Sequence, residues 1–449
     1  MRYTVGVVSL GCAKNLVDTE TMLGILSKEG YQLVVKEEDA DILIVNTCGF
    51  IESAKQESIN TILKLAQYKQ YGKCKILIVA GCLAERYHQE LQNEIPEVDG
   101  IIGTGNFSEI VEVIKKTLAG KKYLSYGNQN YTFQEDLPRL LATPSYTAYL
   151  KIADGCDHFC TYCIIPYLRG KYRSRKIEDI IREAEELSRR GVKELIVIAQ
   201  DISEYGKDIY GEYMLTDLLK ELVKIEKIQW IRLLYTYPEN ITDDLIEVIK
   251  NNEKICNYID IPLQHSHDEI LKKMGRRITK KEIIKLIEKL RNSISNIVIR
   301  TSLIVGFPGE EEYHFQDLLN FVKNTQLDHI GVFPYSMEEN TPAAQLPHQI
   351  DEEVKKIRKN RIMEAQQSIS LRKNKKRVGK IYKVLVEGKS NEDNIYYGRS
   401  YEFAPDIDGL VYFKSDSPIS IGNFYSVKIN KSFEYDLLGE VVHENESCK

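Results

Sequence analysis

The sequence contains no long hydrophobic run. No stretch approaches the roughly 18 apolar residues that a membrane-spanning helix requires, and the first residues hold only a short apolar segment without the longer hydrophobic region of a secretory signal. We therefore expect a cytoplasmic protein that does not contact a membrane.

An excess of positive charge is also absent. The formal net charge of −5 gives no overall attraction to nucleic acid, so only a local basic patch would bind it. The 449 residues are 43% hydrophobic and 28% charged. A chain of this length and composition can bury a substantial core and predicts about three domains.

What the sequence does contain is nine cysteines, which in a cytoplasmic chain are read as reduced thiols or metal ligands. Cys156, Cys160 and Cys163 fall within eight residues, directly after a predicted strand, so one loop can wrap three sulfurs around a metal centre. Structural zinc takes four protein ligands, and only His158 in the same loop offers a fourth. Three thiolates on a four-iron cluster instead leave one iron open for a substrate or cofactor. The spacing favours an iron-sulfur cluster over zinc.

A second set of cysteines is defined by position and not by spacing. Cys12, Cys48 and Cys82 each follow a predicted strand of the N-terminal region by one to three residues. The ends of parallel strands meet at one edge of a sheet. From this pattern alone, a second metal site and three buried core cysteines are both open.

The remaining cysteines show no comparable arrangement. Cys74, Cys256 and Cys448 are predicted to be ordinary buried or surface thiols. His265 and His267 alternate at the end of a predicted strand, where they would either face a cavity or be polar loop residues, and we expect the second.

Alternating strand and helix patterns divide the chain into an α/β protein with five segments. Residues 1–125 predict an N-terminal domain with a parallel sheet, and residues 126–145 a linker. Residues 146–350 contain six β/α repeats, which predict an open, TIM-like partial barrel whose working face is formed by the carboxyl ends of its strands. Residues 351–377 predict a charged helix, either an arm between domains or a solvated face. Residues 378–449 hold five short strand patterns, typical of a small β-barrel of the oligonucleotide-binding kind.

The Cys-x3-Cys-x2-Cys loop at the end of a barrel strand resembles the radical S-adenosylmethionine (SAM) superfamily. The resemblance implies that the amino and carboxylate groups of SAM chelate the open iron, and that one electron from the cluster releases a 5′-deoxyadenosyl radical. Tyr162 matches the position that lies near the adenine of the cofactor in that superfamily; a plain packing role is the alternative.

Two N-terminal stretches, SLGCAKNLVD at 9–18 and NTCGFI at 46–51, closely resemble the methylthiotransferase family. The likeness covers essentially the whole chain and implies a methylthiotransferase domain, a radical SAM barrel and a TRAM-like barrel. It also implies two 4Fe-4S clusters, the second held by Cys12, Cys48 and Cys82. One cluster would make the radical, the other would hold or deliver sulfur, and a second SAM would supply the methyl group. An external electron donor and a sulfur source are implied as partners.

Within the family, one branch modifies an adenosine of tRNA, and the RimO-like branch modifies the β-carbon of an aspartate in protein twelve of the small ribosomal subunit. Several stretches resemble the RimO-like branch, at residues 9–18, 342–347, 352–354, 398–400, 404–409 and 434–439. Tyr167 instead resembles the tRNA branch, because RimO-like chains often carry serine at this position.

The charge of the C-terminal segment bears on the same choice. From residue 380 onward there are eight Lys or Arg against twelve Asp or Glu, a net charge of −4. An RNA-gripping barrel is expected to be basic, whereas an acidic barrel suits a basic ribosomal protein; an acidic solubilising surface is the simpler alternative. We therefore expect a ribosomal protein, free or in the ribosome, as substrate, with tRNA as the alternative.

A non-catalytic iron-sulfur electron carrier is the alternative of another class. No residue stands out as a general base.

Overall fold

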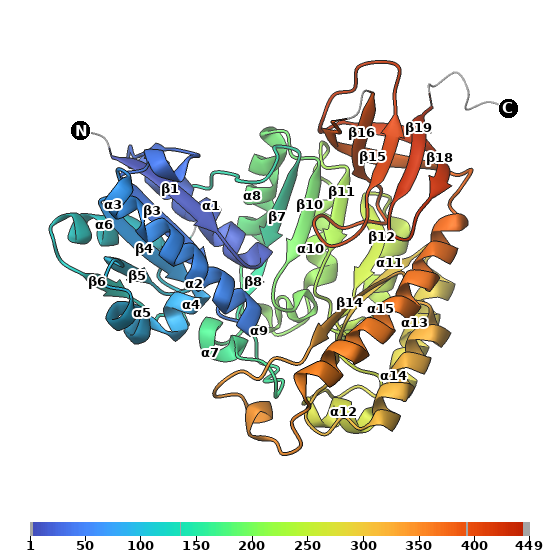
Figure 1. Cartoon of the computed structure of the whole chain (residues 1–449). Helices are drawn as coiled ribbons and strands as arrows, with labels where there is room; N and C mark the ends of the chain where they lie inside the picture. The colour runs from blue at the N-terminus through green and yellow to red at the C-terminus, as the bar shows by residue number, and fades with distance from the viewer. Residues whose placement is uncertain (1–2, 135, 392–393, 443–449) are drawn as a thin grey trace.

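The computed structural model describes residues 3–134, 136–391 and 394–442. It contains an N-terminal α/β unit, a central open barrel of parallel strands and a C-terminal closed barrel, as the sequence predicts (Figure 1). Within these ranges, no helix is both long enough and apolar enough to cross a bilayer.

The N-terminal unit is built on a six-stranded parallel sheet in the order β2-β1-β3-β4-β5-β6. Its strands are β1 Thr4–Ser9, β2 Gln32–Leu33, β3 Ile42–Thr47, β4 Ile76–Gly81, β5 Gly100–Ile102 and β6 Tyr123–Ser125. Its helices are α1 Ala13–Lys28, η1 Glu37–Asp39, α2 Glu52–Ala66, α3 Tyr68–Tyr71, α4 Cys82–Arg86, α5 His88–Glu94, η2 Phe107–Glu109 and α6 Ile110–Leu118.

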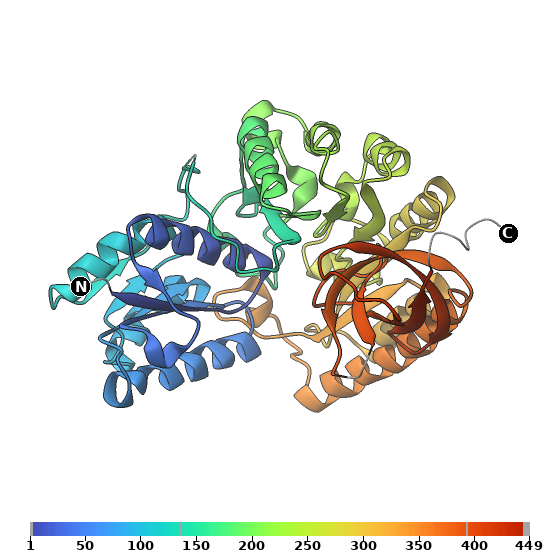
Figure 2. The same cartoon turned by 90° about the horizontal axis from the view of Figure 1, so that it is seen from above.

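Both faces of this sheet are covered, with α1 and α2 on opposite sides (Figure 2). Every residue of β3 and β4 is buried, and successive side chains enter different cores. Ile42 and Ile44 pack with α1 and α6, whereas Leu43 and Val45 pack with α2. This is the near-continuous apolar pattern expected of strands inside a parallel sheet.

The central barrel is a second parallel sheet, in the order β14-β13-β12-β11-β10-β7 and open between its end strands. Its strands are β7 Thr147–Lys151, β10 Glu194–Ile198, β11 Trp230–Leu233, β12 Ile255–Asp260, β13 Val298–Val305 and β14 His329–Pro334, and a short hairpin β8 Ala153–Asp154 and β9 Arg173–Ser174 follows β7. Its helices are α7 Ile165–Arg169, α8 Ile177–Arg189, η3 Ile202–Glu204, α9 Lys207–Tyr210, α10 Leu215–Leu222, η4 Pro238–Asn240, α11 Asp243–Asn251, α12 Asp268–Lys273, α13 Lys280–Ser293, α14 Glu312–Thr325 and η5 Pro342–Gln345.

Helix α15, Glu352–Lys375, packs against α14 and β14 and leads into the C-terminal barrel (Figure 1). One face of the helix is buried, including Arg358, which pairs with Glu310 at 2.9 Å. At its end Lys373 pairs with Asp328, whereas the next lysines are exposed. The helix is therefore both a connection between the barrels and a packed wall of the central one.

The C-terminal strands form a closed barrel in the order β15-β16-β17-β19-β18. They are β15 Ile381–Lys389, β16 Ile395–Arg399, β17 Val411–Lys414, β18 Phe424–Ser432 and β19 Leu437–Val441.

A buried ion cluster joins this barrel to the amino ends of the central strands. Glu194 of β10 receives Arg399 at 2.5 Å and Arg232 at 2.9 Å, and all three side chains are at most 1% exposed. Tyr258 donates a hydrogen bond to Asp408 at 2.7 Å. Because the C-terminal barrel closes this end, the carboxyl ends of the strands are the end of the central barrel that is left for chemistry.

Candidate metal centre and substrate site

The first cysteine loop lies between β8 and α7, at the carboxyl end of β7. Its base is closed by backbone hydrogen bonds, from the Cys156 amide to the Gly170 carbonyl at 3.1 Å and from the Cys163 amide to the Cys160 carbonyl at 2.9 Å. Gly155 has a φ of +84°, and a side chain there would lie 2.0 Å from the Lys171 carbonyl oxygen. A glycine is therefore required for the chain to turn into the loop.

The three thiols of this loop lie close enough to affect one another. Burial, opposed only by a backbone hydrogen bond, raises the pKa of Cys156 to about 12. Burial and the neighbouring Cys160 raise the pKa of Cys163 well above its ordinary value. A cation that binds these sulfurs would displace their protons, so metal binding and thiol deprotonation are coupled here.

An aromatic and cationic layer backs the same loop. The Tyr237 hydroxyl lies 3.4 Å from the Cys160 sulfur, and the His158 ring stacks on Tyr237 with centroids 3.8 Å apart. His158 is also hydrogen bonded to Asp201 at 2.7 Å. The Arg276 guanidinium lies over the other face of Tyr237, 3.7 Å from the ring centroid. His158 is thus held by the Asp201 carboxylate and the Tyr237 ring. This arrangement does not favour His158 as a fourth metal ligand beside the three cysteines.

Tyr162, the residue predicted to lie near a cofactor, packs against a small apolar cluster. The cluster contains Ile270, Met274, Phe307 and Tyr335. Burial raises the pKa of the Tyr162 phenol well above its ordinary value, so the hydroxyl stays protonated. The ring forms part of an apolar wall next to the cysteine loop.

The contact between Tyr237 and Cys160 gives a testable expectation for the bound cluster. A hydroxyl donated to a cluster thiolate raises the reduction potential, because it stabilises the more negative reduced form. A bond that is about 1 kcal/mol stronger to the reduced cluster than to the oxidised one corresponds to roughly 40 mV for one electron. We expect Tyr237→Phe to lower the potential of this cluster by about that amount, as measured by a redox titration followed by electron paramagnetic resonance.

Tyr205→Phe is the matched control, since the Tyr205 hydroxyl donates to the Arg175 carbonyl at 2.8 Å and touches no cysteine. An unchanged potential in Tyr237→Phe, at full iron content, would show that the hydroxyl does not act on the cluster.

The second set of cysteines meets at the carboxyl edge of the N-terminal sheet. Cys12 precedes α1, Cys48 follows β3 by one residue and Cys82 begins α4 directly after β4. A side chain at Gly11 would lie 2.8 Å from the Cys48 Cβ, and one at Gly49 would lie 2.9 Å from the Cys82 backbone. The two glycines therefore allow the three loops to approach one another closely.

These three thiols differ in their electrostatic surroundings. Burial raises the pKa of Cys82 to about 12 and also raises the pKa of Cys48. Burial acts in the same direction on Cys12, but the charges of Lys14 and Arg169, together with backbone hydrogen bonds from residues 14 and 15, outweigh it and lower the pKa of that thiol. The edge thus combines soft sulfur ligands with nearby positive charge, which suits a negatively charged iron-sulfur cluster.

A buried ionic network links the two cysteine loops. Arg169, at the end of α7, binds Asp154 of the barrel at 2.9 Å and Asp18 of α1 at 3.0 Å. The same guanidinium donates to Asn15 at 2.6 Å, and the Cys82 thiol lies 3.8 Å from the Asn15 side-chain oxygen. Lys151 also binds Asp18. Burial acts to raise the pKa of Asp154, but Arg169 and Lys151, together with Arg173 and a hydrogen bond from Gln200, outweigh it and hold that pKa far below its usual range.

The spread of the sulfurs bears on the choice between zinc and an iron-sulfur cluster. Among the described residues, two groups of three side chains have ligand atoms that all lie within 4.8 Å of one another; both consist of histidines and carboxylates, and neither cysteine set is among them. Thiolates on one zinc ion, at about 2.3 Å each, would be closer together than that limit. A cluster of four irons is larger and holds its thiolates further apart, so both sets fit a cluster better than a single ion.

The other cysteines and the two histidines lie apart from these sets. Cys74 and Cys256 are buried free thiols, and Cys448 lies outside the described residues. His267 is a loop residue that caps α12 by accepting from the Glu269 amide. His265 also lies in the loop but is fully buried; its ring accepts from the His267 amide at 3.0 Å and lies 3.7 Å from Glu310.

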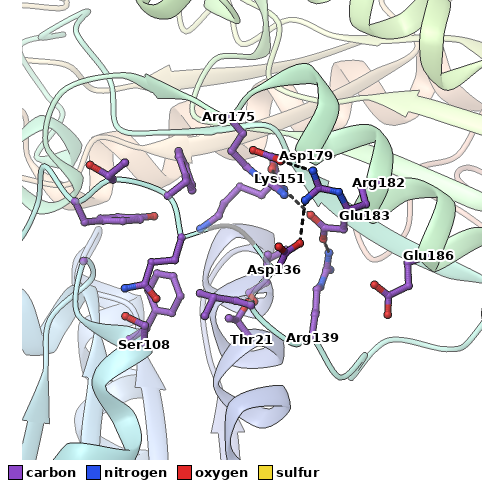
Figure 3. A pocket seen from close by; sticks show the side chains of 18 of the residues that line it. Thr21, Ser108, Asp136, Arg139, Lys151, Arg175, Asp179, Arg182, Glu183 and Glu186 are labelled. Atoms are coloured by element: carbon purple, nitrogen blue, oxygen red, sulfur yellow. Dashed lines mark hydrogen bonds and ion pairs between the residues drawn. The ribbon is translucent and has the colours of Figure 1, made fainter. Parts of the chain in front are cut away.

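A cavity of about 600 Å³ lies between α1, the segment around Asp136 and α8 (Figure 3). Charged side chains line it, and they are paired with one another: Arg182 with Asp136 at 2.9 Å and Arg139 with Glu183 at 2.6 Å. No cysteine lines this cavity. It is therefore separate from both cysteine sets.

Comparison with known families divides the chain into three matched regions. Residues 4–103 match the uncharacterized protein family UPF0004, residues 150–322 match the Radical SAM superfamily, and residues 378–442 match the TRAM domain.

Two solved structures have a similar fold. The radical S-adenosylmethionine methyltransferase TsrM from Kitasatospora setae aligns with a TM-score of 0.55 at 14% identity, covering 76% of this chain and 77% of that one. The cobalamin-dependent S-adenosylmethionine radical enzyme OxsB aligns with a TM-score of 0.51 at 14% identity, covering 82% and 58%. At this identity the likeness concerns the fold alone.

Two curated relatives are similar over nearly the whole chain, and both carry the name ribosomal protein uS12 methylthiotransferase RimO. The protein from Clostridioides difficile (strain 630) is 52% identical over 440 residues, covering 98% of this chain and 99% of that one. The protein from Thermoanaerobacter sp. (strain X514) is 55% identical over 436 residues, covering 97% and 99%. The chain therefore belongs to the RimO family of methylthiotransferases, within the radical SAM superfamily.

Proposed function

We propose that this protein adds a methylthio group to the β-carbon of an aspartate in ribosomal protein uS12. One observation carries the proposal beyond family membership: two sets of three cysteines lie at the carboxyl edges of two parallel sheets, and the buried side chain of Arg169 ties those edges together. Replacing hydrogen by sulfur at one carbon needs a radical site and a sulfur site that meet at that carbon.

Iron-sulfur and SAM chemistry come with the radical SAM superfamily. For this chain we propose two 4Fe-4S clusters, one held by Cys156, Cys160 and Cys163 and one by the second cysteine set, namely Cys12, Cys48 and Cys82. When bound, the first cluster and SAM would supply a radical that removes a hydrogen atom. The second cluster would supply the sulfur atom that replaces it, and a second SAM the methyl group.

The residues around the first cluster would bind and orient the cofactor. We assign Tyr162 to the wall against which the adenine of SAM packs, because its ring is fixed by the apolar cluster next to the loop. Among the described residues, no carboxylate forms an ion pair with Arg276, although its side chain is 95% buried. Arg276 is therefore available to the carboxylate of the cofactor.

The proposal also covers the organisation and surroundings of the chain. It includes a methylthiotransferase domain at 1–125, a linker at 126–145, a radical SAM barrel at 146–350, a connecting helix at 351–377 and a TRAM-like barrel at 378–449. It places the enzyme in the cytoplasm, supplied by an external electron donor and a sulfur source.

The alternative substrate, an adenosine of tRNA, is less well supported. The curated relatives are named for a ribosomal protein, and the segment from residue 380 onward is acidic. A non-catalytic electron carrier is disfavoured because each set offers three thiolates and not the four that saturate a simple carrier cluster.

The test is the mass of uS12, free and within small ribosomal subunits, after anaerobic incubation with reconstituted enzyme, sulfide, reductant and SAM. The expected result is the gain of one methylthio group on an aspartate. Release of 5′-deoxyadenosine without any gain on uS12 would contradict the proposed substrate, and a methylthiolated adenosine in tRNA under the same conditions would replace it.

A further inference from the structure

Lys14 is a buried cation without a carboxylate partner among the described residues. The residue is 8% exposed, and its amine lies 3.5 Å from the centroid of the Tyr235 ring. Within residues 3–134, 136–391 and 394–442, no ion pair includes Lys14. Burying an ammonium group without a carboxylate partner is costly. The Tyr235 ring and the Cys12 thiol favour the charge here, and a ligand carboxylate would complete an ion pair with it.

The neighbouring buried cations differ from Lys14 in this respect. Lys151 binds Asp18, Arg169 binds Asp18 and Asp154, and Arg300 binds Asp260 at 2.8 Å. Each of them completes an ion pair between elements of the fold. Lys14 differs from these three cations because the described residues offer it no carboxylate.

The position of Lys14 indicates which ligand it would meet. It lies in the first turn of α1, two residues after Cys12, and its side chain reaches the central barrel at Tyr235, just beyond the carboxyl end of β11. Tyr235 has a φ of +64°, an unfavourable value for a bulky residue, and its amide is held by Asp260 at 3.1 Å. The amine therefore sits between the edge with the second cysteine set and the working end of the barrel, where a reacting carbon would have to lie.

Resting on the function proposed above, we propose that Lys14 binds the carboxylate of the target aspartate. The β-carbon of aspartate is bonded directly to the carboxylate carbon, so an ion pair with Lys14 would fix the reacting C–H group to within one bond. An adenine offers no carboxylate, so its binding would leave the buried amine unpaired. The site would therefore reject an adenine. Lys14 would then be a residue that determines substrate specificity.

Another role for the charge comes from the second cysteine set itself. The amine of Lys14 interacts electrostatically with the Cys12 thiol and lies near Arg169. In that role the charge would balance a negative cluster and would be indifferent to the substrate side chain. Binding the substrate carboxylate and balancing the cluster charge predict different results. They can be distinguished by removing the Lys14 charge from the enzyme and the aspartate charge from the substrate in turn.

The experiment is a double-mutant cycle on the reconstituted full-length enzyme, with uS12 and its Asp→Asn variant at the target position as probes. Binding is measured by isothermal titration calorimetry in the presence of SAM, and iron content is measured for each protein. We expect Lys14→Met to weaken binding of uS12 by about 10- to 100-fold, the usual range for a hydrogen bond to a charged group. Binding of the Asn variant should be the same for both enzymes.

Two variants sharpen the comparison. Lys14→Arg keeps the charge and should retain most of the affinity for uS12. Lys28→Met removes an exposed charge from the last turn of the same helix and should bind both probes as the unchanged enzyme does.

Equal weakening for the two probes would overturn the proposal and assign the charge to the cluster, as would no weakening for either. Failure of the proposed function is read from the unchanged enzyme: if it binds neither probe and modifies no uS12, the substrate is wrong and the assignment of Lys14 falls with it. If it modifies uS12 while Lys14→Met binds uS12 normally, only the assignment of Lys14 is wrong.

Discussion

Cys160→Ala should abolish the release of 5′-deoxyadenosine while leaving about half of the iron bound. Cys160 is the buried member of the first set and the one whose sulfur contacts Tyr237. Two thiolates cannot hold a cluster at three irons, so the radical site should be lost, whereas the second set lies on another sheet and keeps all its ligands. The measurement is 5′-deoxyadenosine by chromatography after anaerobic reduction, together with iron per chain.

Cys74→Ala is the control for this prediction. Cys74 is also buried, and its thiol donates to the Ile76 carbonyl at 3.2 Å, but it belongs to neither set. This variant should release 5′-deoxyadenosine at the normal rate. Normal release by Cys160→Ala would refute the assignment of the first set.

Cys48→Ala should impair the other half of the reaction. We expect 5′-deoxyadenosine to be released as before and methylthiolated uS12 to fall to background. Cys48 lies at the edge of the N-terminal sheet, and its removal takes one of the three ligands proposed for the sulfur-delivering cluster. The loop with Cys156, Cys160 and Cys163 contains no cysteine of the second set. Cleavage of SAM should therefore continue, but no sulfur would be available for transfer. Mass spectrometry of uS12 and chromatography of the cofactor products measure the two outcomes in the same reaction.

A variant that lacks Cys48, has lost the second cluster by spectroscopy and still forms the methylthio product would show that this cluster is dispensable. The same variant without any release of 5′-deoxyadenosine would show that the two sites do not function separately.

The broad fold could be predicted because its signals are local. The six barrel strands and the strands β1, β3, β4 and β5 are short, largely apolar runs with β-branched or aromatic residues, and each is separated from the next by a helical pattern. The strands that the patterns missed, β2, β6, β8 and β9, have only two or three residues, too few to show a period, and unlike the equally short β5 they are not fully apolar. They pair because neighbouring strands already exist, which is a tertiary effect.

The candidate site divides in the same way. Cys156, Cys160 and Cys163 lie in one loop, so their spacing is visible in the sequence. The second cysteine set could be assembled only from the strand pattern and the family resemblance, because its members are tens of residues apart. Arg169 and Tyr237 carried no signal at all, since the partners that define them come from distant segments, Asp18 for the first and Cys160 for the second.

The ionic link through Arg169 also bears on how the enzyme must work over a catalytic cycle. One guanidinium holds α1 and the base of the first cysteine loop at once, and removing one partner of a buried pair of this kind costs about 3–5 kcal/mol. The separation between the two reaction centres is therefore fixed by the folded chain and does not wait for a closing motion. The two proposed reaction centres are therefore already placed relative to each other before any substrate binds, much as a jig holds two tools at a set spacing.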